Sequence, residues 1–107
     1  MKLHQYQIIL AKLDPTIGSE IKKTRPCVII SPDQMNNFID TIVVAPITST
    51  NKSYPSRIKV KNSKVSGWVV LDQIRTIDKQ RIIKIISELD FNEINDLKQT
   101  IKHVYID

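Results

Sequence analysis

Residues 26–32, "PCVIISP", place the apolar run CVII between two prolines and give the clearest strand signal in the sequence. Proline cannot donate a backbone hydrogen bond, so it is much less common inside a sheet than at strand ends, edge strands and bulges. A short apolar run with such boundaries is typical of a buried strand. A second run, "DTIVVAPI" at residues 40–47, has the same character. Two buried strands in quick succession predict a protein built mainly from β-structure.

The neighbouring segments extend this pattern in both directions. Strands are also predicted at residues 6–13 and 57–62, and residues 67–78 are β-branched and apolar at first and then mixed. Residues 81–89 fit either a strand or a helix. Polar or turn-forming loops separate the strands at 14–18 and 49–56. Many short strands in one chain favour a small antiparallel β-barrel.

The C-terminal segment is the only one with a clear helical pattern. Asp90 and Glu93 have the spacing of a helix N-cap and its reciprocal partner. Apolar residues then recur at helical spacing, at Ile94, Leu97, Ile101 and Val104. We therefore expect one amphipathic helix after the last strand.

Length and composition limit the class of protein. The chain has 107 residues, which is the size of one domain, and we treat 1–107 as a single unit. Hydrophobic residues make up 41%, but no apolar run approaches the roughly 20 residues of a membrane span. The first residues are too polar for a signal peptide, and one cysteine excludes an internal disulfide. These features predict a cytoplasmic protein without a membrane anchor.

The sequence lacks the residues that several kinds of chemistry require. His4 and His103 lie at opposite ends of the chain, and no Cys or His cluster has metal-ligand spacing. Cys27 lies within an apolar run, where a packed thiol is expected rather than a nucleophile. We expect no metal site and no cofactor. The net charge of +5 favours an anionic partner, for which nucleic acid is the commonest choice.

Polar residues gather at the ends of three predicted strands. The first set is Glu20, Lys22, Lys23 and Arg25; the second is Thr48, Ser49 and Thr50; the third is Asp72, Gln73, Arg75 and Asp78. Simple structural roles are open for each set, because charged groups at strand ends are normally solvated. Asp72 and Arg75 would serve as a structural ion pair, and Thr48 and Ser49 as caps of a turn.

Taken together, the sets suit the cleavage of RNA. Arg25 precedes Pro26, whose ring restricts the backbone of the residue before it, so the arginine can offer a fixed fork to a phosphate. The hydroxyls of Thr48 and Ser49 add hydrogen-bond donors, and Glu20 can accept a proton. These groups suffice for attack of a ribose 2′-OH on its own phosphate.

A second basic stretch follows the hydroxyl set, and includes Lys52, Arg57, Lys59, Lys61 and Lys64. A solvated hairpin face and a surface that attracts RNA are both open interpretations. Tyr54, in the same stretch, has the type of ring that stacks on single-stranded bases. Pro55 beside it fits an ordinary turn equally well.

Three segments of the sequence resemble the MazF/PemK (Kid) family of toxins. They are "LDPTIGSEIKKTRPCVIISP" at 13–32, "VVAPITST" at 43–50 and "LDQIRTIDKQRI" at 71–82, in the family's order. The resemblance implies an SH3-like barrel with a C-terminal helix, usually as a homodimer. It also implies an endoribonuclease that needs neither metal nor ribosome and cuts single-stranded RNA at short sequences. A small acidic antitoxin of the MazE or PemI type would block it.

The resemblance also implies roles for individual residues. Arg25 and Thr48 match the family's essential active-site residues, and Glu20 matches a carboxylate with a catalytic role in some members. The expected RNA-binding residues are Lys22, Lys23, Ser49, Thr50, Lys52, Tyr54, Asp72, Gln73 and Arg75.

Two other functions remain open at this point. Gyrase poisons of the CcdB type resemble one another in a Trp-containing tail, whereas this chain ends in "HVYID". A non-catalytic nucleic-acid-binding barrel would show salt-sensitive RNA binding without cleavage.

Overall fold

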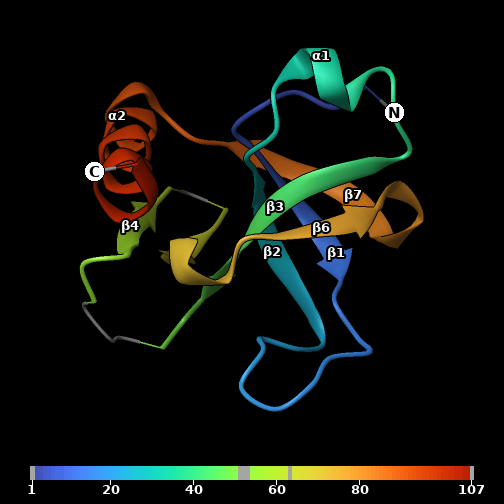
Figure 1. Ribbon diagram of the computed structural model, residues 1–107, viewed down its shortest axis with the longest axis horizontal. Coiled ribbons are helices and arrows are strands. Elements are labelled where there is room, and N and C mark those ends of the chain that lie inside the picture. Colours follow the sequence, from blue (N-terminus) through green and yellow to red (C-terminus); the bar gives the residue numbers. More distant parts are fainter. Residues whose placement is uncertain (1, 51–53, 63, 107) are drawn as a thin grey trace.

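The computed structural model describes residues 2–50, 54–62 and 64–106. Its main feature is a seven-stranded sheet, in which every recorded pairing is antiparallel (Figure 1). The order along the sheet is β4-β5-β3-β2-β1-β7, and β6 pairs with β3. The strands are β1 (Gln7–Lys12), β2 (Thr24–Ile29), β3 (Thr41–Thr48), β4 (Arg57–Lys61), β5 (Ser66–Val70), β6 (Arg75–Asp78) and β7 (Ile82–Glu88).

Strand β3 gives the sheet its barrel-like shape. It pairs with β2 on one side, whereas on the other its first half pairs with β6 and its end, at Ile47 and Thr48, pairs with β5. Within the described part of the chain β4 and β7 are not paired, so the barrel is not strictly closed. The predicted fold class, a mainly β barrel with a C-terminal helix, is confirmed.

The central strands are covered on both faces. Ile8, Val28 and Ala45 belong to one buried cluster, which also contains Leu97 of the helix. Their neighbours in sequence, such as Ile9 and Cys27, belong to a second cluster on the opposite face. A strand buried on both sides needs continuous apolar residues rather than alternation, which explains the runs CVII and IVVA.

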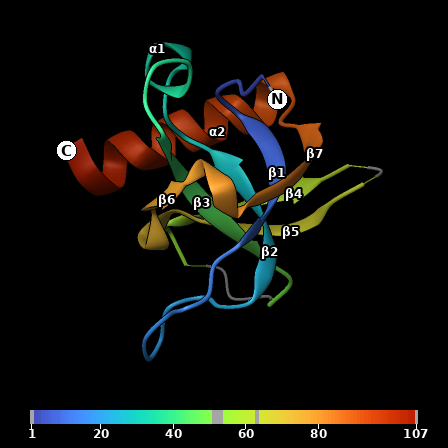
Figure 2. The same cartoon turned by 90° about the vertical axis from the view of Figure 1, so that its right-hand side faces the viewer.

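Helix α2 (Phe91–Ile101) begins at the predicted cap. The Asp90 side chain accepts a hydrogen bond from the Glu93 amide at 2.8 Å, and the Glu93 side chain accepts one from the Asp90 amide at 2.9 Å. The other Glu93 oxygen accepts from the Lys61 amide at 3.1 Å, which joins the helix to β4. Leu97 is buried on the inner face, and α2 lies along one side of the barrel (Figure 2). The chain continues from the helix as a π-helical turn, Lys102–Ile106.

Some elements differ from the sequence-based prediction. Residues 67–78, which are β-branched and apolar at first and then mixed, form most of β5, the 3-10 turn η1 (Leu71–Gln73) and β6. A short helix, α1 (Asp33–Asn36), and a 3-10 turn, η2 (Lys79–Arg81), were not expected. Residues 82–88, which fitted either type of structure, form a strand. No helix among the described residues is long and apolar enough to cross a membrane.

Candidate active site

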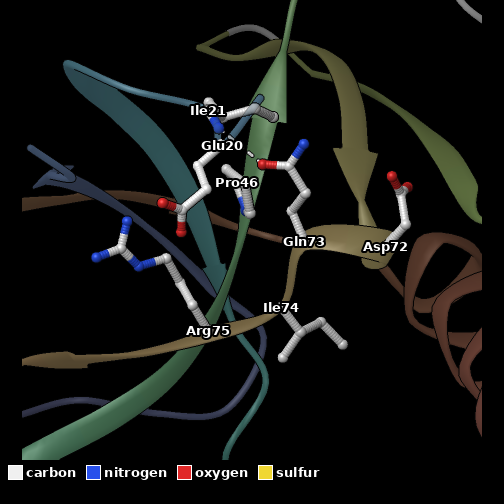
Figure 3. A pocket seen from close by; sticks show the side chains of 7 residues that line it. All are labelled: Glu20, Ile21, Pro46, Asp72, Gln73, Ile74 and Arg75. Atoms are coloured by element: carbon white, nitrogen blue, oxygen red, sulfur yellow. Dashed lines mark hydrogen bonds between the residues drawn. The ribbon is translucent and has the colours of Figure 1, made fainter. Parts of the chain in front are cut away.

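A cavity of about 220 Å³ lies where three segments of the chain meet (Figure 3). The segments are the loop between β1 and β2 (13–23), the end of β3, and the η1–β6 connection. In Figures 1 and 2 the loop projects from the end of the barrel opposite to α1. The lining residues are Glu20, Ile21, Pro46, Asp72, Gln73, Ile74 and Arg75. The cavity therefore brings together members of the first and third predicted polar sets.

The β1–β2 loop supplies Glu20 and is held against η1 by Gln73. The Gln73 Oε1 atom accepts a hydrogen bond from the Ile21 amide at 2.7 Å, and its Nε2 donates to the Ser19 carbonyl at 3.3 Å. One oxygen of Glu20 accepts from the Ile17 amide at 2.7 Å. The Glu20 carboxylate is thus fixed to its own loop, and the loop is fixed to the barrel.

Arg75 forms another part of the wall. It pairs with Val44 in the β3–β6 ladder, and its Nη1 donates to the Leu13 carbonyl at 3.1 Å. In Figure 3 the Arg75 guanidinium and the Glu20 carboxylate point toward one another. The cavity therefore offers a cation and a carboxylate to a bound molecule.

Asp72 has a different partner from the one considered in the sequence. Its Oδ1 accepts hydrogen bonds from Ser56 Oγ at 2.8 Å and Arg57 Nε at 3.3 Å, so its ion-pair partner is Arg57 and not Arg75. Partial burial opposes ionisation, but the hydrogen bonds from Arg57 and Ser56 outweigh it and lower the pKa of the Asp72 carboxyl. A carboxylate with a lowered pKa is a poor proton acceptor, so Asp72 is not suited to act as the base.

Arg25 and Thr48 lie on the neighbouring strands β2 and β3 and are not among the residues that line the cavity. The β2–β3 ladder pairs Cys27 with Pro46, which lines the cavity. The recorded ladder ends at this pair, and Arg25 and Thr48 each lie two residues beyond it, on β2 and β3. Arg25 Nε donates to the Lys22 carbonyl at 3.2 Å, which fixes the guanidinium at the edge of the loop.

The Thr48 side chain also has the turn-capping contact considered above. Its Oγ1 accepts a hydrogen bond from the Thr50 amide at 3.2 Å. Gly67 of β5 lies directly against this residue, because a Cβ at Gly67 would come within 2.5 Å of the Thr48 carbonyl oxygen. Thr48 is therefore held by the turn on one side and by β5 on the other.

Cys27 is a buried thiol, as predicted. It is fully buried, and burial raises its pKa to about 12 in spite of the positive charge of Arg75. A thiolate is the reactive form of cysteine, so Cys27 is not a nucleophile at neutral pH.

The other predicted RNA-binding residues lie around the cavity rather than in it. Lys22, Lys23, Ser49 and Thr50 are exposed. The Tyr54 ring is half-exposed and lies 4.6 Å from the Arg57 guanidinium carbon. Lys52 lies outside the described residues.

The cavity also contains residues that the sequence interpretation did not select. Ile21, Pro46 and Ile74 line it, and Ser56 with Arg57 holds Asp72. Pro46 and Ile74 lie within segments 43–50 and 71–82, which carry the resemblance to the toxins. Their apolar character gave no separate signal, because isolated apolar residues beside strands are normally part of the core.

Solved structures show to which class the fold belongs. The crystal structure of MazF (Form-I) from Deinococcus radiodurans matches with a TM-score of 0.88 over 97% of this chain and 96% of that chain, at 22% identity. An endoribonuclease in complex with its cognate antitoxin, from Mycobacterial species, matches with a TM-score of 0.81 over 94% of this chain and 92% of that chain, at 19% identity. The fold is thus that of the MazF structures.

Relatives in sequence indicate the family more specifically than the fold does. Endoribonuclease MazF of Staphylococcus saprophyticus is 36% identical over 98 residues, which are 83% of this chain and 82% of the relative. Endoribonuclease EndoA of Bacillus subtilis is 37% identical over 90 residues, 78% of this chain and 77% of the relative. The family described as PemK-like, MazF-like toxin of type II toxin-antitoxin system matches residues 4–105, and the chain belongs to this family.

Proposed function

We propose that this chain is a toxin that acts as an endoribonuclease on single-stranded mRNA, without the ribosome and without a metal ion. Two relatives of 36% and 37% identity carry the name endoribonuclease. The observation that supports the proposal is that β2 and β3, which carry Arg25 and Thr48, pair at Cys27 and Pro46, and that Pro46 lines the same cavity as Glu20. A cation, a hydroxyl and a carboxylate then surround one position at which a phosphodiester can bind.

The reaction that suits these groups is an internal transesterification. The 2′-oxygen attacks the adjacent phosphorus as its proton passes to a base. The bond from phosphorus to the 5′-oxygen breaks, and this oxygen takes up a proton. The products are a 2′,3′-cyclic phosphate and a 5′-OH, without an added oxidant or co-reactant. Negative charge develops on the phosphate oxygens, so fixed donors at those oxygens accelerate the reaction.

Each residue has a defined part in this reaction. Arg25 carries a permanent positive charge and stabilises the phosphate oxygens of the transition state. Thr48, supported by Ser49, orients the phosphate by hydrogen bonds. Glu20 accepts the 2′-proton, since its carboxylate faces the cavity and one of its oxygens is not occupied by the Ile17 amide.

We assign the exposed residues Lys22, Lys23 and Thr50 to contacts with RNA phosphates. Lys22 and Lys23 lie on the loop that carries Glu20, and Thr50 follows the strand that carries Thr48. Phosphate contacts of this kind give salt-dependent affinity without base specificity. We assign Tyr54 to stacking on a base, and Lys52, Asp72, Gln73 and Arg75 to further RNA contacts.

The same proposal includes the partners. A net charge of +5 complements a small acidic antitoxin, and solved relatives include MazE–MazF complexes of Deinococcus radiodurans with a TM-score of 0.82 at 21% identity. We propose that this chain acts as a homodimer in the cytoplasm and is inhibited by an antitoxin of the MazE or PemI type.

Treatment of a long RNA with the purified protein in EDTA, followed by sequencing of the new 5′ ends, tests the proposal. Fragments with 5′-OH ends at a recurring short sequence are the expected result. Intact RNA that is bound in a salt-sensitive manner would support the non-catalytic barrel instead. Trapped gyrase–DNA complexes would support the gyrase poison.

A further inference from the structure

We propose that Gln73 is a positioning residue, which holds the β1–β2 loop against the barrel and thereby places both Glu20 and Arg25. The proposal rests on the function proposed above for these two residues. It assigns to Gln73 a role that does not require contact with RNA.

The Gln73 amide bonds to the loop on both sides of Glu20. Its oxygen accepts from the Ile21 amide at 2.7 Å, and its nitrogen donates to the Ser19 carbonyl at 3.3 Å. The two contacts bridge sequence separations of 52 and 54 residues. A single side chain therefore fixes the backbone immediately before and after the proposed base.

Any displacement of the loop would also displace the Glu20 carboxylate, because this carboxylate is hydrogen-bonded within the loop. Its Oε1 accepts from the Ile17 amide at 2.7 Å, and the Glu20 amide donates to the Ile17 carbonyl at 3.2 Å. The position of the carboxylate relative to the barrel is consequently set by whatever holds the loop.

The same tether reaches Arg25 through the next residue of the loop. Ile21, which Gln73 holds, is followed by Lys22, whose carbonyl accepts from Arg25 Nε at 3.2 Å. A displaced loop would remove this acceptor and release the guanidinium from its present direction. Proton transfer and charge stabilisation both depend on placement within a fraction of an ångström to about 1 Å, so loss of the tether reduces the rate.

Other contacts hold the base of the loop and not its tip. The Leu13 amide donates to the Lys23 carbonyl at 2.9 Å, Arg75 bonds to the Leu13 carbonyl, and Arg81 bonds to the carbonyls on either side of Leu13. Among the hydrogen bonds of the described residues, those of Gln73 alone connect Ser19–Ile21 to the barrel. Removal of the amide should therefore loosen the tip, which then keeps only the packing of Ile21 against the core, while the loop stays closed at its base.

The test compares Gln73→Met with Gln80→Met, both in the full chain. Methionine keeps the length of the side chain and deletes its hydrogen bonds. Gln80 is exposed, and its side chain has no hydrogen bond among the described residues, so it is the matched control. Trypsin cleavage after the exposed Lys22 reports loop opening without reference to activity.

Gln73→Met should be cut at Lys22 roughly tenfold faster than the wild type, the factor expected for the loss of such hydrogen bonds. Its kcat on RNA should fall, with KM changed less than kcat. Gln80→Met should match the wild type in both assays. Gln73→Glu, which keeps the acceptor for the Ile21 amide, should be cut at an intermediate rate.

Three results would overturn the proposal. Unchanged protease sensitivity of Gln73→Met would show that the loop is not held by this residue. Faster cleavage by trypsin with unchanged kcat would show that the tether does not position the catalytic groups. A raised KM with normal protection would assign Gln73 to direct RNA contact. If the wild type cuts no RNA, the proposed function fails, and the protease result still decides whether Gln73 holds the loop.

Discussion

Arg57 Nε lies 3.3 Å from Asp72 Oδ1, and this ion pair joins the start of β4 to the turn η1. Ser56 donates to the same carboxylate oxygen. The Arg57 side chain is largely buried, at 11% exposed, whereas that of Asp72 is 37% exposed. The pair therefore fixes the turn that carries Gln73, and it engages the carboxylate of a residue that lines the cavity.

Asp72→Asn should destabilise the protein at neutral pH but not at acid pH. Because the folded-state pKa of Asp72 is lowered, its contribution is fully present above the ordinary carboxyl pKa of about 3.9. The contribution disappears as the pH falls through the lower folded value. Partly exposed pairs are worth at most about 1 kcal/mol, so a small decrease in Tm at pH 7 is expected.

Thermal unfolding of the variant and the wild type between pH 7 and pH 3 measures this effect. Asp96→Asn, on the exposed face of α2, is the control that should show no such pH-dependent difference. A gap in Tm that widens towards acid pH would contradict the role assigned to the Arg57–Asp72 pair.

Gly67→Ala should reduce both stability and RNA cleavage. The added methyl group would lie 2.5 Å from the Thr48 carbonyl oxygen and 2.9 Å from the Ile47 side chain, so β3 or β5 must shift. Overpacking of this kind typically costs about 1–3 kcal/mol. Chemical denaturation and RNA cleavage rates check the two effects, with Ser66→Ala on the exposed start of β5 as control. Normal activity in Gly67→Ala would show that Thr48 does not depend on this contact.

Asp90→Ala should weaken helix α2 and its attachment to the barrel. The substitution removes the hydrogen bond to the Glu93 amide, and loss of an N-cap side chain costs about 1 kcal/mol. A lower denaturation midpoint with an unchanged denaturant slope is expected. Asp96→Ala removes a carboxylate from the same helix without removing the cap. Equal midpoints for the two variants would contradict the importance of the capping box.

The double substitution Lys22→Ala and Lys23→Ala should weaken RNA binding mainly at low salt. Each contact with a single-stranded phosphate contributes roughly 0.7 to the slope of log affinity against log salt concentration. Loss of two contacts should reduce that slope by about 1.4, and RNA affinity measured across a salt series reveals it. Lys84→Ala with Lys102→Ala removes the same charge at exposed positions on β7 and after α2. A similar change of slope in this control would show a general charge effect rather than contacts at the loop.

The clearest local signals in the sequence were sufficient to predict most of the fold. The continuous apolar run before Pro32 indicated a buried strand, and the Asp90–Glu93 spacing predicted the start of α2 within the observed cap. Both signals are local, because strand burial and helix capping depend on residues that are close in the chain.

Structure that depends on distant contacts was not predictable in this way. The turn η1 interrupts a segment of strand-like composition, and its side chains bond to Ser56, Arg57 and the β1–β2 loop. The short helix α1 contains the buried Asn36, whose amide bonds to Ser31. Both elements are too short for a hydrophobic periodicity to be recognised in the sequence.

For the site, the residue types were predictable and the pairings were not. Glu20, Asp72, Gln73 and Arg75 were selected as charged or polar groups at strand ends, and they line one cavity. The ion-pair partner of Asp72 is Arg57 rather than Arg75, which is nearer in the sequence, because the fold brings the start of β4 next to η1. The RNA contacts of these residues stay predictions.

The rate of RNA cleavage by Arg25→Ala tests the central claim most directly. With the folded state verified by its denaturation midpoint, the variant should lose about 10²–10³-fold in kcat, because one transition-state donor is removed. Lys84→Ala, exposed on β7, should retain the wild-type rate. Cleavage by folded Arg25→Ala at a rate close to that of the wild type would contradict the assignment of Arg25 to the reacting phosphate.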